Sequence, residues 1–166
     1  MQKDNHYTLK QIGTIKTPYQ KNAPYQPVDT DKQEFYILLN NEYVDGLSEL
    51  KKFNYIYLIF FADRITQEPE MMVSPPWAEG KKVGVFASRS PVRPNPIGLS
   101  IVQIKEIVGN KIYTSGLDVF DKTPLLDIKP YIKDLDNKDN ANYGWIKEMD
   151  DMSHLSLHIK GIPHDY

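Results

Sequence analysis

The chain of 166 residues contains no cysteine. This absence excludes a disulfide framework, a zinc–thiolate centre and a cysteine nucleophile. Long apolar runs are also missing: no stretch approaches the ~18 residues of a membrane-spanning helix, and the first residues contain no apolar segment typical of a secretory signal. Neither sign of charge dominates, since the formal net charge is −2. We therefore expect a cytoplasmic protein in which any contact with nucleic acid depends on local cations.

The composition is that of one globular domain. Hydrophobic residues make up 40% of the chain and charged residues 25%, and this length can bury a core without metals or disulfides. Short runs rich in aromatic and β-branched residues predict strands. These runs are residues 6–17, 34–39, 53–62, 82–88, 98–108 and 111–120. Strands spaced so closely, with few helices between them, predict a mainly β fold, an antiparallel barrel or a sandwich.

Individual segments allow sharper predictions. Residues 53–62 are almost continuously apolar, which indicates a central strand covered on both faces. The pair Gly109-Asn110 between two apolar runs predicts a β-hairpin. Residues 43–52 predict one short helix with Leu47 and Leu50 on its inner side, whereas prolines and a glycine make residues 66–82 a loop.

Residues 88–100, with the sequence SRSPVRPNPIGLS, form a proline-rich segment that also carries two arginines. Each proline fixes its own φ angle and pushes the preceding residue toward extended geometry, so Arg89 and Arg93 sit on a stiffened loop. Gly98 then lets the chain turn into the next strand. A stiff loop loses less entropy when it clamps a ligand. The alternative is a rigid connector with its arginines in water.

This segment, continued as GLDVFDKTPLLDIKPYI over residues 116–132, resembles the tRNA-methyltransferase O family, as does IGTIKTPY over residues 12–19. The resemblance spans roughly residues 10–145. It implies a small single-domain antiparallel β-barrel that works as a homodimer. It also implies S-adenosylmethionine as cofactor and methylation of N6-threonylcarbamoyladenosine beside the anticodon of tRNA. We accordingly expect a barrel domain over residues 1–145 and a C-terminal tail over residues 146–166, in which the alternation of residues 154–162 indicates an added strand.

The resemblance also implies which residues line the cofactor pocket. They are Pro24, Tyr25, Gln26, Asp63, Arg64, Arg89, Leu99, Ser115, Gly116, Leu117 and Asp118. Three positions differ from the usual family pattern. Asp63 stands where family members commonly have a histidine, Tyr25 replaces an arginine, and Lys122 replaces a glycine.

Methyl transfer from a sulfonium requires the nucleophile to lie in line with the methyl group and water to be excluded. Carboxylates suit the neighbourhood of the sulfonium, and an arginine such as Arg89 suits the carboxylate of the cofactor. A carboxylate close to the accepting nitrogen could take its proton, and the candidates are Asp118 and Asp121, with Asp127 as a third. The alternative is that these aspartates satisfy loop N–H groups.

If the protein binds RNA, local cationic side chains must make the contacts. We expect Arg93, Lys122 and Lys129 to line one rim of the pocket and to contact phosphates. The alternative for residues 127–131 is structural, with Asp127 capping a turn and Pro130 ending a strand.

Two further features have competing interpretations. His154 and His158, with His164 beyond, have the spacing of a metal pair, but no further ligands complete a shell, so we expect no metal. Trp77, beside two prolines, is a candidate aromatic residue that closes over substrate. Two functions compete with a tRNA methyltransferase: a methyltransferase of this fold acting on another nucleoside or a small molecule, and a non-catalytic module that binds S-adenosylmethionine.

Overall fold

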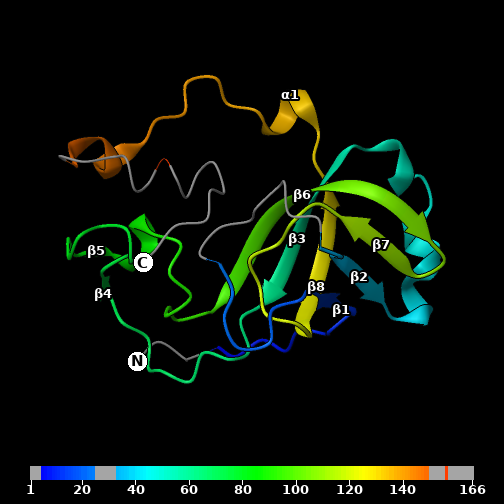
Figure 1. Ribbon diagram of the computed structural model, residues 1–166, viewed down its shortest axis with the longest axis horizontal. Coiled ribbons are helices and arrows are strands. Elements are labelled where there is room, and N and C mark those ends of the chain that lie inside the picture. The colour runs from blue at the N-terminus through cyan, green and yellow to red at the C-terminus, as the bar shows by residue number, and fades with distance from the viewer. Residues whose placement is uncertain (1–4, 25–32, 150–155, 157–166) are drawn as a thin grey trace.

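Six antiparallel strands form the centre of the protein in a computed structural model that describes residues 5–24, 33–149 and residue 156 (Figure 1). The strands are β1 (Gly13–Lys16), β2 (Tyr36–Leu39), β3 (Tyr55–Phe61), β6 (Ile97–Val108), β7 (Lys111–Thr114) and β8 (Thr123–Pro130). They pair in the order β1-β2-β7-β6-β3-β8, and β8 pairs again with β1, so the sheet closes into a barrel. The predicted mainly β architecture with few helices is confirmed.

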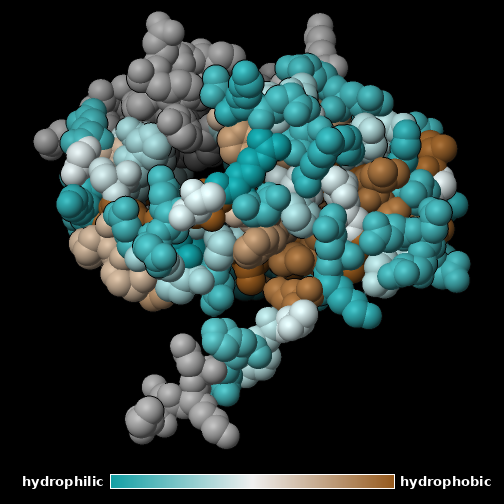
Figure 2. Space-filling model, turned by 90° about the horizontal axis from the view of Figure 1, so that it is seen from below, coloured by the Kyte–Doolittle hydropathy of each residue, from teal (hydrophilic) through white to brown (hydrophobic). Residues whose placement is uncertain are grey.

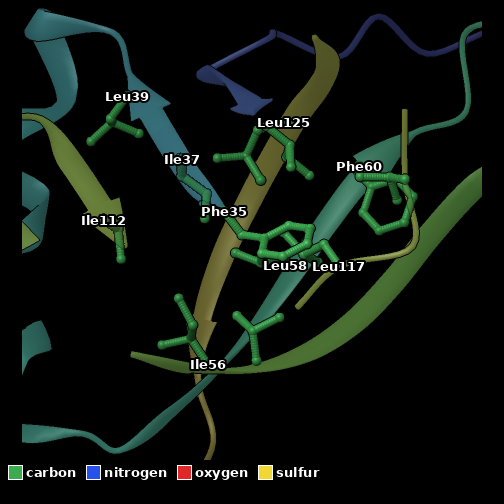
Figure 3. Close-up of a cluster of buried hydrophobic side chains, with 12 residues drawn as sticks. Phe35, Ile37, Leu39, Ile56, Leu58, Phe60, Ile112, Leu117 and Leu125 are labelled. Carbon is green, nitrogen blue, oxygen red and sulfur yellow. The ribbon is translucent and has the colours of Figure 1, made fainter. Parts of the chain in front are cut away.

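The core fills the interior of this barrel (Figure 3). Side chains alternate along each strand, so every second residue points inward. The fully buried members include Ile15, Ile37, Leu58, Ile112 and Leu125, which come from five of the six strands. In the described ranges no helix is long and apolar enough to cross a membrane.

The strand β3 differs from its prediction in one respect. Its inward side chains are buried, but the outward Tyr55 and Phe61 are 45% and 39% exposed. The neighbouring strand β6 presents Leu99 and Ile101 on the same outer face, 56% and 50% exposed. The expectation of a strand covered on both faces is therefore only partly met, because among the described residues the outer face of β3 is covered only in part, by Tyr131, whose ring centroid lies 6.5 Å from that of Tyr55 and 5.6 Å from that of Tyr57.

The predicted helix over residues 43–52 is replaced by two short 3-10 helices, η1 (Asn41–Leu47) and η2 (Leu50–Lys52). Glu49 separates them with a φ angle of +66°, a left-handed conformation that an α-helix cannot contain. Leu47 and Leu50 do pack against the core, as predicted.

The β6–β7 hairpin is confirmed, with Gly109 at a φ angle of +59° in the turn. Gly98, by contrast, does not make a turn. It lies inside β6 beside Phe60, and a Cβ atom there would come within 2.1 Å of the Phe60 ring. The glycine is needed because the aromatic ring occupies the space of a side chain. The predicted strand over residues 111–120 ends early, at Thr114.

A second, smaller unit lies beside the barrel (Figure 1). Its two-stranded sheet consists of β4 (Met72–Val73) and β5 (Val83–Gly84), followed by the 3-10 helix η3 (Val85–Ala87). The predicted loop over residues 66–82 thus contains a strand, and the predicted strand over residues 82–88 is mostly η3.

After β8 the chain forms α1 (Lys133–Asp136) and then η4 (Gly144–Glu148), which reaches the small sheet (Figure 1). Neither helix is among the elements predicted from the sequence. The strand predicted over residues 154–162 falls almost entirely outside the described residues.

Candidate functional site

The proline-rich loop between η3 and β6 is fixed from within by Arg93. Its Nε donates to the carbonyl of Ser90 at 2.7 Å, and its Nη2 donates to the carbonyls of Ser88 at 2.6 Å and Val85 at 3.1 Å. Arg93 therefore stiffens the loop, and the bonds that it makes compete with the phosphate contact expected of it. Arg89 on the same loop is exposed and makes no hydrogen bond with any residue that the structure describes.

The buried run after β7 leads to Asp118. Ser115 fixes this run to β6, because its N–H donates to the carbonyl of Gln103 and its hydroxyl accepts from the N–H of Gln103, both at 3.0 Å. Gly116 and Leu117 follow, with Leu117 fully buried in the barrel core. The run is thus held to β6 at Ser115 and to the barrel core at Leu117, immediately before Asp118.

Asp118 has an unusual electrostatic environment. Burial raises the pKa of its carboxyl from 3.8 to about 6, and a bond from its own backbone N–H and the charge of Arg89 offset only part of that effect. In the described ranges no side chain donates a hydrogen bond to this carboxylate. Asp118 and Arg89 come from separate loops and form no ion pair in the part of the chain that the structure describes, but the charge of Arg89 reaches the Asp118 carboxyl, and each side chain has hydrogen-bonding capacity to spare.

Asp121 has a different role from Asp118. Its two oxygens lie 2.8 and 2.9 Å from Lys16 Nζ, and it also accepts from Gln20 Nε2 at 3.0 Å and from the N–H of Thr17 at 3.4 Å. Burial alone would raise the pKa of Asp121, but these bonds outweigh it and hold the pKa below the ordinary 3.8. Asp121 thus joins the end of β1 to the start of β8, which matches the structural alternative.

Arg64, expected to line the cofactor pocket, anchors the same region. Its Nη1 donates to the carbonyl of Gln20 at 2.6 Å and its Nη2 to that of Asp121 at 2.9 Å. Its guanidinium also lies 4.6 Å from the centroid of the Phe120 ring. The adjacent Asp63, at the usual histidine position, is exposed.

The remaining pocket residues predicted from the sequence are dispersed. Leu99 lies on the outer face of β6, opposite Ile59 of β3 and directed away from the core. Pro24 is half-buried, and Tyr25 and Gln26 fall outside the described residues. The charge of Arg89 therefore reaches Asp118 at the end of the Ser115–Asp118 run, whereas Leu99 lies on an exposed surface.

Lys122 and Lys129 do not share one rim with Arg93. Lys122 directly precedes β8 and Lys129 lies near its end, and the six residues between them place their Cα atoms about 23 Å apart along an extended strand. Lys129 lies 2.8 Å from Asp127 in an ion pair, and the same carboxylate accepts from the N–H of Ile128. β8 ends at Pro130, as the structural alternative predicted.

Trp77 does not close over a substrate site. Its ring stacks on Trp145 of η4, with centroids 5.3 Å apart and planes inclined by 2°. Sequence reasoning missed Trp145, although a tryptophan in a polar, acidic segment was a usable signal, because such a large ring is seldom left in solvent. In the described part of the chain no group of three His, Asp or Glu residues could hold a metal, and His154, His158 and His164 lie outside it.

Comparison with known proteins adds a consistent result. The model of the tRNA-methyltransferase O N-terminal domain matches residues 14–137. A probable S-adenosyl-L-methionine-binding protein of Archaeoglobus fulgidus is 36% identical over 150 residues, which are 89% of this chain and 40% of that protein. The tRNA (adenine(37)-N6)-methyltransferase of Escherichia coli is 35% identical over 136 residues, covering 76% of this chain and 58% of that enzyme.

Solved structures agree with these similarities. The crystal structure of TrmO from Pseudomonas aeruginosa superimposes with a TM-score of 0.69 at 27% identity, over 84% of this chain and 62% of that one. This chain therefore corresponds to less than two thirds of the length of several proteins that it matches, 40% for the archaeal protein and 62% for this structure.

Proposed function

The chain belongs to the tRNA-methyltransferase O family, and we propose that it uses S-adenosylmethionine to methylate N6 of N6-threonylcarbamoyladenosine beside the anticodon of tRNA. The observation that carries this proposal is the match of residues 14–137 to the family domain, within which the charge of Arg89 acts on the buried carboxyl of Asp118. The names of the relatives, which specify S-adenosylmethionine binding and adenine-37 methylation, support it. We also propose the cytoplasm as its location, because its tRNA substrate is found there.

The two residues fit the cofactor chemically. S-adenosylmethionine carries a carboxylate, an ammonium group, a sulfonium and ribose hydroxyls. The Arg89 guanidinium, without a described hydrogen bond, suits the carboxylate. Asp118 is desolvated, and no other described side chain donates to it, so it suits a hydroxyl or ammonium donor whose bond would offset the cost of burial.

The reaction needs few chemical groups from the protein. When bound, S-adenosylmethionine supplies an electrophilic methyl group on its sulfonium. The proline-stiffened loop would supply Arg89 to hold the carboxylate of the cofactor, and the Ser115–Leu117 run, held to β6 and to the core, would position Asp118 for the proton transfer. Such positioning and exclusion of water are the main contributions to methyl transfer.

Among the three candidate carboxylates, Asp118 is the best proton acceptor. Asp121 is held by Lys16 and Asp127 is paired with Lys129, so both are committed to cations. A carboxylate with a pKa of about 6 is ionised at neutral pH and more basic than an ordinary aspartate, as general base catalysis requires. Asp118 has two oxygens, so one can face the cofactor while the other accepts the proton from N6.

We propose that the active form is a homodimer that covers the outer face of β3 and β6. In the register of this strand pair, Tyr57 lies opposite Ile101 and Ile59 opposite Leu99, which makes a contiguous apolar surface. Such surfaces are typical of interfaces. Leu99, expected from the family to contact the cofactor, lies on this face, which supports a cofactor pocket completed at the dimer contact.

The N-terminal residues offer further apolar surface. Tyr7 and Leu9 are 83% and 59% exposed. Figure 2 shows other apolar side chains reaching the surface between hydrophilic ones. Contact with a second subunit would bury the outer face of β3 and β6 together with Tyr7 and Leu9. We retain the division into a barrel domain over residues 1–145 and a tail over residues 146–166 as part of the proposal.

RNA contact is assigned to the two ends of β8. Lys122 and Lys129 are both exposed, and a folded RNA is large enough to span about 23 Å of strand. Phosphate contacts depend on such local cations rather than on net charge. Arg93 is a poorer candidate than these lysines because its Nε and Nη2 already bind backbone carbonyls.

A second candidate function is binding of S-adenosylmethionine without catalysis. It is favoured by the archaeal relative whose name specifies binding alone and which covers 89% of this chain. The two functions are separated by incubating the protein with methyl-labelled S-adenosylmethionine and total tRNA, then digesting the tRNA and analysing its nucleosides by mass spectrometry. Label in a threonylcarbamoyl adenosine supports the methyltransferase, label elsewhere indicates a different substrate, and binding without label in RNA supports the second candidate.

A further inference from the structure

A second hydrophobic core, separate from the barrel, supports the loop that carries Arg89. It consists of Val73, Val83 and Val85, with Trp145 packed against them. None of these residues belongs to the barrel core. The position of the loop therefore depends on how this small unit is held, and the barrel core does not fix it.

Trp145 of η4 packs against the small core and joins η4 to it. Its indole Nε1–H donates to the carbonyl of Ala87 at 2.8 Å, two residues before Arg89. Its ring stacks on Trp77 at 5.3 Å, and Lys81 Nζ lies 5.4 Å from the ring centroid. Lys81 also bridges to Glu148 of the same helix, η4, at 3.3 Å. A hydrogen bond, a stacked ring and a cation thus hold η4 onto the small sheet.

The contacts of Trp145 and Arg93 meet at η3. Trp145 binds the carbonyl at the end of this short helix, and Arg93 binds the carbonyl of Val85 at its start. Between them they fix the backbone from Val85 to Ser90, the segment that contains Arg89. The Arg89 side chain makes no described hydrogen bond of its own, so this backbone fixes the position of its Cα atom, while its rotamer stays free to adapt to a ligand.

Trp145 also lies beyond the residues matched by the family model, which end at position 137. The chain runs from β8 through α1 to η4 and so crosses from the barrel to the small unit (Figure 1). A segment outside the matched domain therefore returns to the loop of the candidate site.

We propose that Trp145 is a positioning residue that holds the Arg89 loop in its cofactor-binding conformation. This inference rests on the proposed function, since it takes Arg89 as a ligand of S-adenosylmethionine. The physical effect is preorganisation: a loop that is already ordered loses less entropy when it binds. Loss of the clamp lets the loop sample other conformations and lowers the fraction competent to bind.

The test compares Trp145→Ala and Trp145→Phe with wild type and with a control, Lys147→Ala. Phenylalanine keeps a ring for stacking but lacks the N–H donor. Lys147 is an exposed residue of the same helix and makes no ion pair or hydrogen bond with the residues that the structure describes. Three quantities are measured in the full chain: the rate of tryptic cleavage after Arg89 with fragments assigned by mass spectrometry, the calorimetric Kd for S-adenosylmethionine, and the far-ultraviolet unfolding midpoint.

We expect cleavage after Arg89 to become about tenfold faster and the Kd about tenfold weaker in Trp145→Ala, the size of effect of one lost hydrogen bond with its packing. Cleavage reports loop opening when opening is fast, so it needs no cofactor. The unfolding midpoint, dominated by the barrel, should change little. Trp145→Phe should fall between wild type and Trp145→Ala, and Lys147→Ala should match wild type.

Two results would overturn the positioning role alone. One is wild-type cleavage and affinity in both Trp145 variants. The other is faster cleavage with unchanged affinity, because the clamp would then order the loop without serving the cofactor. If the wild-type protein itself fails to bind S-adenosylmethionine, the proposed function fails and the positioning role fails with it, a result distinct from the other two.

Discussion

The Asp118 carboxylate and the Arg89 guanidinium interact electrostatically although they belong to separate loops. Asp118 follows β7 and Arg89 precedes β6, and both loops lie toward the end of the barrel where β6 and β8 begin. A carboxyl whose pKa is raised by burial and influenced by a nearby cation is a candidate for a functional site. Predictions on these two residues therefore test the candidate site most directly.

Arg89→Ala should weaken binding of S-adenosylmethionine by about 1.5–3 kcal/mol, the value of a charge-assisted hydrogen bond. The unfolding midpoint of Arg89→Ala should stay close to that of wild type, because the exposed Arg89 side chain makes no hydrogen bond with the residues that the structure describes. Arg64→Ala is the matched comparison. It removes bonds to the carbonyls of Gln20 and Asp121, so it should lower the unfolding midpoint. Calorimetry and thermal unfolding of both variants check this, and unchanged affinity in folded Arg89→Ala would reject the role.

Asp118→Asn should stabilise the protein at pH 8 and have little effect at pH 4. The folded-state pKa is raised to about 6, so the ionised carboxylate opposes folding above that pH, while below pH 4 the group is protonated in both states. The gain at pH 8 should be on the order of 1–3 kcal/mol, and methyl transfer should be lost. Denaturant unfolding at the two pH values measures the difference.

Asp121→Asn is the control for Asp118→Asn, because it should change the stability of the protein at pH 8 in the opposite direction. The pKa of Asp121 is lowered in the folded state, so its ionised form contributes stability above the unfolded pKa, and that contribution disappears as the pH falls through the folded pKa. The variant should therefore destabilise the protein at pH 8. A stabilising effect there, or a pH-independent effect of Asp118→Asn, would contradict the assigned environments.

Ile101→Lys should convert a dimer into a monomer with little activity. The residue is 50% exposed at the middle of the apolar face of β3 and β6, and a buried unpaired ammonium would oppose association. Val108→Lys, on the same strand but beyond its pairing with β3, is 52% exposed and should remain dimeric. Light scattering at the assay concentration distinguishes the two, and an active monomeric wild type would refute the proposal.

Lys122→Gly should raise stability by roughly 0.5–1 kcal/mol. Lys122 has a φ angle of +69°, which costs a residue with a side chain about 1 kcal/mol but costs glycine little. Lys122→Ala removes the same charge and keeps the strained backbone, so it should give no such gain. Equal stabilities of the two variants in denaturant titrations would show that the backbone conformation is not the cause.

Removing both lysines of β8 should change the salt dependence of tRNA binding. In the double variant Lys122→Ala/Lys129→Ala, loss of two phosphate contacts should reduce the slope of log K against log salt by about 1.4–1.8. The double variant Lys10→Ala/Lys21→Ala should keep the wild-type slope, because these exposed lysines lie outside the proposed contact. Cofactor affinity should be unchanged in both. Equal slopes in the two double variants would mean that RNA binds elsewhere.

The parts of the fold that depend on residues adjacent in the sequence were predictable. Gly109-Asn110 specifies the hairpin turn, and strand alternation specifies the core. The burial of β3 was not predictable in the same way, because a continuous apolar run looks the same whether its outer face packs within one chain or against a second copy. The break at Glu49 was also missed, since a left-handed glutamate has no signature in sequence.

The site was predicted in outline only. Motif similarity indicated Arg89 and Asp118, and in the structure the charge of Arg89 acts on the Asp118 carboxyl. Motif similarity could not show that Arg64, Arg93 and Asp121 have structural roles instead. Their hydrogen-bond partners are backbone groups of loops that come close only in the folded protein. The position of Trp145 against Ala87 depends on the path of the chain from β8 to η4, which lies outside the motifs.

The seam between β1 and β8 has a consequence for how the protein is made. Ile15 pairs with Thr123, so the first strand of the barrel must wait for the last strand before the sheet can close. At ~5–20 residues per second on the ribosome, the intervening chain takes roughly 5–20 s to synthesise. During that time the nascent sheet has two open edges and can pair with other chains. Lys16 and Asp121, which lie beside the seam, cannot meet until translation has passed both.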